Sequence, residues 1–212
     1  SRYGGEETAH VTFCTGREPL YRMEINGVTL TLGMPHVGGP SASPFIEEVC
    51  AMGGKYFVFF GAAGTLNRDI PFNSFILPTA AVRDEGLSYH YLPPADEVEL
   101  DPACVEVCRQ AMRSLGLPFT EGKTWTTDAF YRETRGKVER RRKQGCLCVE
   151  MECASLAAVA KFRGVRFAEF FYVTDNLDSP VWDAGVLGQQ GASMADKCIA
   201  VAVETGRRLK EL

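Results

Sequence analysis

Short apolar runs alternate with amphipathic helical patterns along most of the chain. Residues 56–60 form a continuous run of aromatic and aliphatic side chains, which is typical of a strand covered on both faces. Similar runs predict strands at residues 28–32, 75–82, 124–127, 146–149 and 167–174. Strands that alternate with helices in this way indicate a layered α/β fold around a buried, largely parallel sheet.

Helical patterns occupy the segments between these runs. Ser43 and Pro44 predict the start of a helix that runs to Gly53, because proline suits a first turn and glycine suits an exit. Further helices are predicted at residues 103–115, directly after Glu152, and at residues 193–209. The polar stretch at 93–102 is expected to be a surface loop, so residues 1–212 are interpreted as a single domain.

Composition and charge narrow the classes of function. Hydrophobic residues make up 45% of the 212 positions, which is enough for a substantial core. No apolar run reaches the roughly 18 residues that a membrane span needs. The formal charge of −4 offers no general attraction to nucleic acid, and the basic run from Arg132 to Lys143 favours a solvated helix face. We therefore expect neither a membrane nor a nucleic acid as partner.

The eight cysteines lie mainly at apolar positions of the predicted core elements. Such positions favour reduced thiols in a cytoplasmic protein over a framework of disulfides. The chain contains no Cys-x-x-Cys pair and its three histidines are scattered, so neither zinc nor another metal is expected. The first residues lack the apolar stretch of a signal peptide, which also favours a cytoplasmic location.

Two glutamates flank a methionine immediately before an almost wholly apolar helix, in the order Glu150, Met151, Glu152. Carboxylates beside such a helix need a polar partner, because an unpaired buried charge is costly. The vicinal hydroxyls of a sugar are one such partner, since they can donate two hydrogen bonds to one carboxylate. Taken alone, the simpler interpretation is that both glutamates serve the helix N-terminus, whose dipole favours negative charge.

The glutamate pair is the last of four short motifs. GGPS at residues 38–41 opens a helix, FGAAG at 60–64 follows a strand, TDAFY stands at 127–131, and EME at 150–152. Together with VTDN at 173–176, this ordered set resembles the nucleoside phosphorylase and nucleosidase family, which includes uridine phosphorylase, bacterial-type purine nucleoside phosphorylase and methylthioadenosine nucleosidase. The likeness runs from about Tyr21 to the C-terminus. It implies a three-layer α/β/α fold with a central twisted, mostly parallel mixed β-sheet.

The resemblance also implies site residues. Glu152 would take the ribose hydroxyls and so stabilise positive charge that builds up on the sugar. Asp175 would be the general acid for the departing base, because the end of an apolar strand favours a carboxyl that keeps its proton. The implied substrate-binding residues are Phe130 on the base, Met151 against the sugar, Glu150 beside or behind it, and the turn of Gly61, Ala62 and Gly64 towards phosphate.

Two positions depart from the phosphorolytic members that the chain resembles. Those enzymes usually carry an arginine at the position of Phe59 and a serine or threonine at the position of Ala62, and both side chains contact phosphate. The family also has a longer N-terminal segment with a phosphate loop, which nothing before Tyr21 matches. The chain is therefore interpreted as a shortened member or as part of a longer one. Arg17, Arg83 or an arginine from a neighbouring subunit could replace the missing cations.

The function implied by the resemblance is cleavage of the N-glycosidic bond of a nucleoside, with phosphate or water as the acceptor. A purine base is slightly favoured over uracil, because Asp175 suits a purine. No cofactor is expected, although inorganic phosphate is a candidate co-substrate. A homo-oligomer, a dimer or larger, is expected because family members complete each pocket with residues of a neighbour. The alternative is a catalytically inactive protein that binds nucleosides on the same scaffold.

Overall fold

The computed structural model describes residues 4–189 and 191–212 of the chain. Three strands, β1 (Glu6–Phe13), β2 (Gly16–Ile25) and β3 (Val28–Leu32), form a small antiparallel sheet. The other strands are β4 (Tyr56–Thr65), β5 (Phe75–Asp84), β6 (Glu97–Glu99), β7 (Phe119–Thr127), β8 (Cys146–Glu150) and β9 (Arg166–Asn176). The α-helices are α1 (Gly39–Ala51), α2 (Pro102–Ser114), α3 (Arg135–Lys143), α4 (Cys153–Arg163) and α5 (Ala195–Leu209). Short 3-10 helices are η1 (Ser88–His90), η2 (Phe130–Arg132) and η3 (Leu187–Gln189).

The large sheet is mixed, with the strand order β6-β5-β7-β8-β4-β9. Its pairs β4–β9, β5–β7 and β7–β8 are parallel, whereas β4–β8 and β5–β6 are antiparallel. Strand β5 also pairs with β9 through Phe75 and Ile76, so the sheet curls until its pairings form a closed ring. The mixed α/β architecture confirms the predicted fold class.

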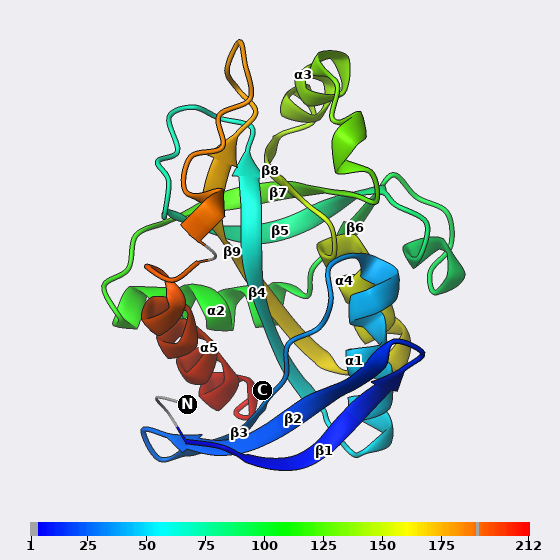
Figure 1. The fold of residues 1–212 in the computed structure, drawn as a ribbon, viewed down its shortest axis with the longest axis vertical. Helices are drawn as coiled ribbons and strands as arrows, with labels where there is room; N and C mark the ends of the chain where they lie inside the picture. Colours follow the sequence, from blue (N-terminus) through cyan, green and yellow to red (C-terminus); the bar gives the residue numbers. More distant parts are fainter. Residues whose placement is uncertain (1–3, 190) are drawn as a thin grey trace.

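Helices cover the large sheet in two pairs (Figure 1). Helices α2 and α5 pack against each other on one side, and α1 and α4 pack against each other on the other. The small sheet lies below α1 and the start of β4, where Val11, Leu20 and Phe45 form an apolar cluster of their own. No helix in the described part of the chain is long and apolar enough to cross a membrane.

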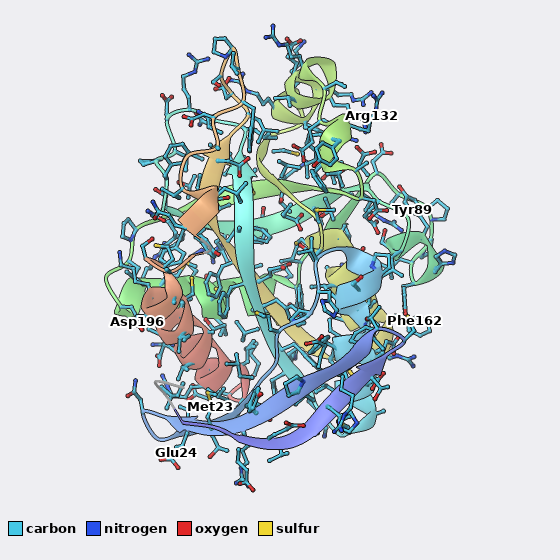
Figure 2. All side chains as sticks on the ribbon, viewed as in Figure 1. Met23, Glu24, Tyr89, Arg132, Phe162 and Asp196 are labelled. Atoms are coloured by element: carbon cyan, nitrogen blue, oxygen red, sulfur yellow. The ribbon has the colours of Figure 1, made fainter. Side chains whose placement is uncertain are left out.

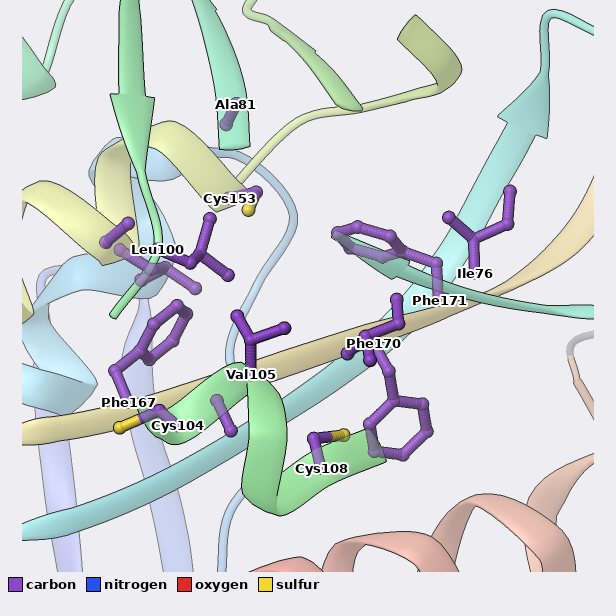
Figure 3. Packing of buried hydrophobic residues seen from close by; sticks show 14 of the residues in the cluster. Ile76, Ala81, Leu100, Cys104, Val105, Cys108, Cys153, Phe167, Phe170 and Phe171 are labelled. Carbon is purple, nitrogen blue, oxygen red and sulfur yellow. The ribbon is translucent and has the colours of Figure 1, made fainter. Parts of the chain in front are cut away.

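Apolar side chains from both helix layers meet the strands in one main core. Figure 3 shows Cys104 and Cys108 of α2 beside Phe167 and Phe170 of β9. These two cysteines and Cys153 are fully buried, as the sequence predicts for core thiols. Burial raises the pKa of the Cys104 thiol to about 11, so this sulfur stays protonated and unreactive at neutral pH.

Helix α1 begins at Gly39, within the GGPS motif and four residues before the start predicted from Ser43 and Pro44, so Pro44 lies inside the helix. The reason is tertiary: the N–H of Gly39 donates to the carbonyl of Met151 at 3.0 Å, which ties the helix start to the turn before α4. A Cβ at Gly39 would lie 2.2 Å from the Ser155 Oγ, so only glycine allows this approach. The glycine-rich motif therefore brings α1 against α4.

Three further differences from the sequence prediction follow from pairing or charge. Strands β1 and β2 were not predicted, and the expected surface loop at 93–102 contains β6, which pairs with β5. The basic run is only partly a solvated face. Arg141 is buried, pairs with Asp84 at 3.1 Å and lies over the Trp125 ring, while Arg142 pairs with Asp178 at 2.7 Å. The half-buried Asp84 and the buried Asp178 hold these cations against the fold.

Candidate active site

A single cavity of about 1130 Å³ collects the residues that the sequence places in the site. It opens at the carboxyl ends of β4, β8 and β9, where α/β folds commonly bind ligands. Its wall includes all eight candidates, which are Gly61, Ala62, Gly64, Phe130, Glu150, Met151, Glu152 and Asp175. The structure thus brings together four segments that are distant in sequence.

Glu152 is held at this wall by backbone groups. Its Oε1 accepts a hydrogen bond from the N–H of Gly38, and its Oε2 accepts one from the N–H of Met151 at 3.3 Å. Burial raises the pKa of the Glu152 carboxyl, whereas these two backbone bonds act in the opposite direction. Each oxygen retains acceptor capacity beyond its one bond, so the fixed carboxylate can still accept bonds from a sugar.

Glu150 has a different place from its neighbour. One oxygen accepts from the hydroxyls of Thr126 at 2.6 Å and Thr124 at 3.2 Å, and the other accepts from the N–H groups of Glu152 at 2.6 Å and Cys153 at 2.7 Å. These last two bonds are those of a carboxylate that serves the start of α4, as in the simpler interpretation of the pair. Burial, followed by the charge of Glu152, raises the Glu150 pKa to about 7. Through the bond from the Glu152 N–H, Glu150 holds the backbone that carries the Glu152 side chain.

Phe130 and Met151 provide apolar surface in the cavity. Phe130 belongs to η2 and is 49% exposed, with its ring centroid 4.3 Å from that of Tyr131. It is therefore not an ordinary core residue, and its exposed ring can pack on a flat aromatic ligand. Figure 2 labels Arg132, the last residue of the same 3-10 helix η2, beside α3 at the upper end of the molecule.

The Asp175 carboxylate lies near the end of β9 and is bound on both oxygens. Oδ1 accepts from the Thr174 hydroxyl at 2.9 Å, and Oδ2 accepts from the Trp182 indole N–H at 2.8 Å. A Cβ at Gly64 would lie 3.0 Å from Asp175 Oδ2 and 2.5 Å from the Leu177 side chain, so glycine is needed beside this carboxylate. Sequence reasoning missed Trp182, which stands seven residues further along the chain.

Glu133 is a second carboxyl on the cavity wall that sequence reasoning missed. It lies between η2 and α3, within a segment interpreted only as a basic helix. Burial raises its pKa to about 7, the charge of Asp175 contributes in the same direction, and Lys137 opposes it. The only sequence signal for Glu133 as a site residue is its position three residues after the aromatic Phe130. Asp175, whose charge acts on it, stands 42 residues further along the chain.

The segment from Gly61 to Gly64 is not the turn that the sequence predicted. It is extended within β4 and pairs with Phe171 to Asp175 of β9, with an irregularity between Ala63 and Gly64. Strand β8 pairs with β4 only at Gly64 and Thr65, according to the described register. The preceding edge of β4 is therefore open towards the cavity, where backbone N–H groups can meet a ligand.

The cations suggested as replacements for a phosphate arginine lie elsewhere. Arg83 is buried and bonds to Ser88 Oγ at 2.7 Å and to the Pro93 carbonyl at 2.8 Å. Arg17 is exposed on the small sheet and bonds to His10 at 2.8 Å. The arginines on the cavity wall are instead Arg68, Arg135 and Arg142.

Glu169 adds an acidic group beside the position where phosphorolytic relatives would carry arginine. It is the register partner of Phe59 on the neighbouring strand, and both residues line the cavity. Glu169 is 4% exposed, and its Oε2 has no hydrogen-bond partner among the described residues. Burial, and then the charge of Glu150, raise its pKa well above the ordinary value.

Comparison with known proteins agrees with this architecture. The chain matches the model of the Phosphorylase superfamily over residues 4–205, and it therefore belongs to that superfamily. The match includes β1 and β2, so the expectation that the likeness begins near Tyr21 was wrong.

Individual relatives carry several names within this superfamily. The uridine phosphorylase of Salmonella typhimurium is 28% identical over 203 residues, which cover 89% of this chain and 79% of that protein. The guanosine phosphorylase of Halorubrum lacusprofundi is 28% identical over 152 residues, which cover 72% of this chain and 63% of that protein. The purine nucleoside phosphorylase DeoD-type 1 of Shewanella oneidensis is 26% identical over 179 residues, which cover 82% of this chain and 73% of that protein.

Proposed function

We propose that this protein is an enzyme that cleaves the N-glycosidic bond of a nucleoside. The observation that carries the proposal is the Glu152 carboxylate, fixed by two backbone N–H groups on the wall of a cavity that also contains Phe130 and Asp175. The names of the relatives, which are uridine, guanosine and purine nucleoside phosphorylases, support the same reaction class.

Each part of the cavity matches one demand of that reaction. Positive charge develops on the sugar as the bond breaks, and the carboxylate of Glu152 stabilises it. Phe130 offers a face for the base, and Met151, which also lines the cavity, offers apolar surface to the sugar. The departing base gains negative charge, so the carboxyl of Asp175 assists by proton donation. These groups favour an active enzyme over an inactive nucleoside-binding protein.

For the acceptor, the geometry supports water. The positions at the open edge of β4 carry Phe59 and Ala62, and the buried carboxyl of Glu169 lies beside them. A phosphate dianion there would lack charge-assisted bonds from its neighbours on β4 and would face an acidic group. We therefore propose hydrolysis to free ribose, with a purine as the favoured base.

The same proposal includes assembly into a dimer or larger oligomer and a location in the cytoplasm. Two apolar side chains on the cavity wall, Met34 and Tyr131, are more than three-quarters exposed. A second copy of the chain would cover such side chains, which supports a dimer as the smallest form. Free cysteines, most of them buried, support a reducing compartment such as the cytoplasm.

The test is a panel of purine and pyrimidine nucleosides, incubated with the purified protein in the presence and absence of phosphate. We expect base and free ribose, with little dependence on phosphate below millimolar levels. Glu152→Gln should reduce turnover by about 10²-fold or more, since it removes charge that stabilises the transition state. Glu99→Gln, at an exposed position of the edge strand β6, is the matched control.

The outcomes separate the parts of the proposal. Cleavage that saturates with micromolar phosphate and yields ribose 1-phosphate would overturn the water acceptor but not the bond cleavage. No release of base from any nucleoside under either condition would overturn the enzymatic function and leave a binding protein. Full activity of Glu152→Gln would remove Glu152 from the site.

A further inference from the structure

The loop that follows β9 places Trp182 beside the candidate acid. Its indole N–H donates to Asp175 Oδ2 at 2.8 Å, and both residues line the cavity. Trp182 is 56% exposed, so more than half of its surface gains nothing from burial. The directed interaction of this side chain is the one between its N–H and the carboxyl, which indicates a task in the site and not in the core.

Contacts on both sides of Trp182 hold this loop against the fold. Before it in the chain, the buried Asp178 accepts a hydrogen bond from the Arg142 guanidinium at 2.7 Å. After it, Asp183 and Asn176 exchange two backbone hydrogen bonds, of 2.8 and 3.1 Å. Because the backbone is fixed on either side, the fold itself presents the indole to the end of β9.

The donors that reach the candidate acid are neutral. The arginines of the cavity wall bond instead to Asp178 or to the Pro180 carbonyl. Within residues 4–189 and 191–212, the hydrogen bonds to the Asp175 carboxyl come from the Trp182 indole and from the Thr174 hydroxyl, at 2.9 Å. A hydroxyl can also turn to accept a bond, whereas an indole N–H can only donate. The indole is therefore the partner that is committed to an oxygen bearing negative charge.

We propose that Trp182 is a positioning residue for the acid: its indole N–H orients the Asp175 carboxyl and stabilises the carboxylate that forms as the proton leaves for the base. This inference rests on the proposed function, in which Asp175 protonates the departing base. A hydrogen bond to an ionised acceptor is roughly twice as strong as one to a neutral acceptor, so the bond strengthens during proton transfer. An interaction that strengthens in the transition state raises kcat and leaves substrate affinity largely unchanged.

The step balances as follows for a purine nucleoside and water. The bond between the sugar C1′ and the base nitrogen breaks, and its electron pair goes to the base. The Asp175 carboxyl gives its proton to N7 of the base and becomes a carboxylate, which accepts from the Trp182 N–H. The water oxygen bonds to C1′ and releases a proton to solvent, and solvent returns a proton to Asp175.

The experiment compares guanosine with its N7-methylated form, whose base is already cationic and leaves as a neutral molecule without an added proton. Wild-type protein and Trp182→Phe, which keeps an aromatic ring but removes the N–H, are assayed for kcat and KM on both nucleosides. Trp182→Phe should lower kcat on guanosine by about 10- to 10²-fold, the range for a lost hydrogen bond to a charged group. Its KM for guanosine and its cleavage of the methylated substrate should change little.

The matched control is Tyr56→Phe. It removes the polar group of another exposed aromatic side chain, at the first residue of β4 and outside the cavity wall. This variant should cleave both nucleosides at the wild-type rate. Cleavage of the methylated nucleoside by Trp182→Phe reports at the same time that the variant is folded and that its sugar site is intact.

Asp175→Asn provides the second measurement. Adding Trp182→Phe to Asp175→Asn should slow guanosine cleavage no further, because the indole acts through the carboxyl and two changes on one path are not additive. A full additional loss in that background would overturn the inference. Unchanged kcat on guanosine in Trp182→Phe, or an equal loss on both nucleosides, would also overturn it.

A faster cleavage of guanosine by Trp182→Phe would overturn the inference as well, since the indole would then obstruct the base. All of these results leave the proposed function standing, because the wild-type protein still cleaves the substrate. Failure of the wild-type protein to cleave either nucleoside would overturn the proposed function and this role together.

Discussion

Glu169 is a buried residue whose replacement should stabilise the protein. It is 4% exposed, its Oε2 has no hydrogen-bond partner among the described residues, and the other polar contact of its side chain is a hydrogen bond with Cys153. Methionine has a similar volume and no group that must be hydrogen-bonded. The substitution Glu169→Met therefore removes an unsatisfied polar atom and leaves the packing beside Phe59 largely unchanged.

The magnitude follows from the unsatisfied oxygen. A buried polar group without a partner costs about 1–3 kcal/mol, and Glu169→Met should recover a gain of that size at neutral pH. For a chain of this length each kcal/mol corresponds to a rise in Tm of roughly 2–4 °C. Glu169→Gln should gain less, because its amide group still lacks full hydrogen bonding. The surface substitution Glu99→Met should change stability by no more than about 0.5 kcal/mol.

The gain should depend on pH in a defined direction. Burial and the Glu150 charge raise the folded-state pKa of Glu169 well above its ordinary value of 4.5. The stability associated with the protonated carboxyl is therefore fully present below the unfolded pKa and is lost as pH rises towards the folded pKa. One such group changes the free energy of unfolding by about 1.4 kcal/mol per pH unit over that interval. Glu150, with a pKa raised to about 7, acts with the same sign.

The assay is urea unfolding at one fixed protein concentration, followed by fluorescence of the fully buried Trp125. The advantage of Glu169→Met over wild type should grow from about pH 5 to pH 7, and the wild-type decline should be steeper than that of the variant. A variant that is less stable than wild type, or an advantage that does not change with pH, would refute the reasoning.

Two further predictions concern the scaffold. Gly39→Ala should destabilise the protein by about 1–3 kcal/mol in urea and weaken catalysis, because its Cβ would overlap Ser155 and shift the Gly38 N–H from Glu152. The control Gly136→Ala has open space around its Cβ in α3 and should be neutral or stabilising, so an equal loss in both variants would contradict the argument. Sedimentation at working concentration should show a dimer or larger species, and a monomer would contradict the proposed assembly.

Much of the fold could be predicted because local patterns and tertiary packing agree there. The aromatic run at the start of β4 and the apolar run of β9 predict buried strands, and the structure pairs the two in parallel. The amphipathic pattern of α2 predicted that helix to within a residue of each end. The capping pattern of Ser43 and Pro44 misplaced the start of α1 by four residues, because its first residue is set by contacts with Met151 and Ser155 that local propensity does not contain.

The candidate site divides in the same way. The sequence alone determined that two glutamates, an aromatic residue and an aspartate stand at strand ends, and motif order assigned them to one site. Only the tertiary structure decided that Glu150 supports the backbone while Glu152 faces the cavity, because their hydrogen-bond donors come from β7 and from the start of α1. The approach of Glu133 to Asp175 and of Glu169 to Phe59 was also invisible in the sequence. Burial and the nearness of other charges depend on how distant segments pack, and both raise the pKa of Glu133 and of Glu169.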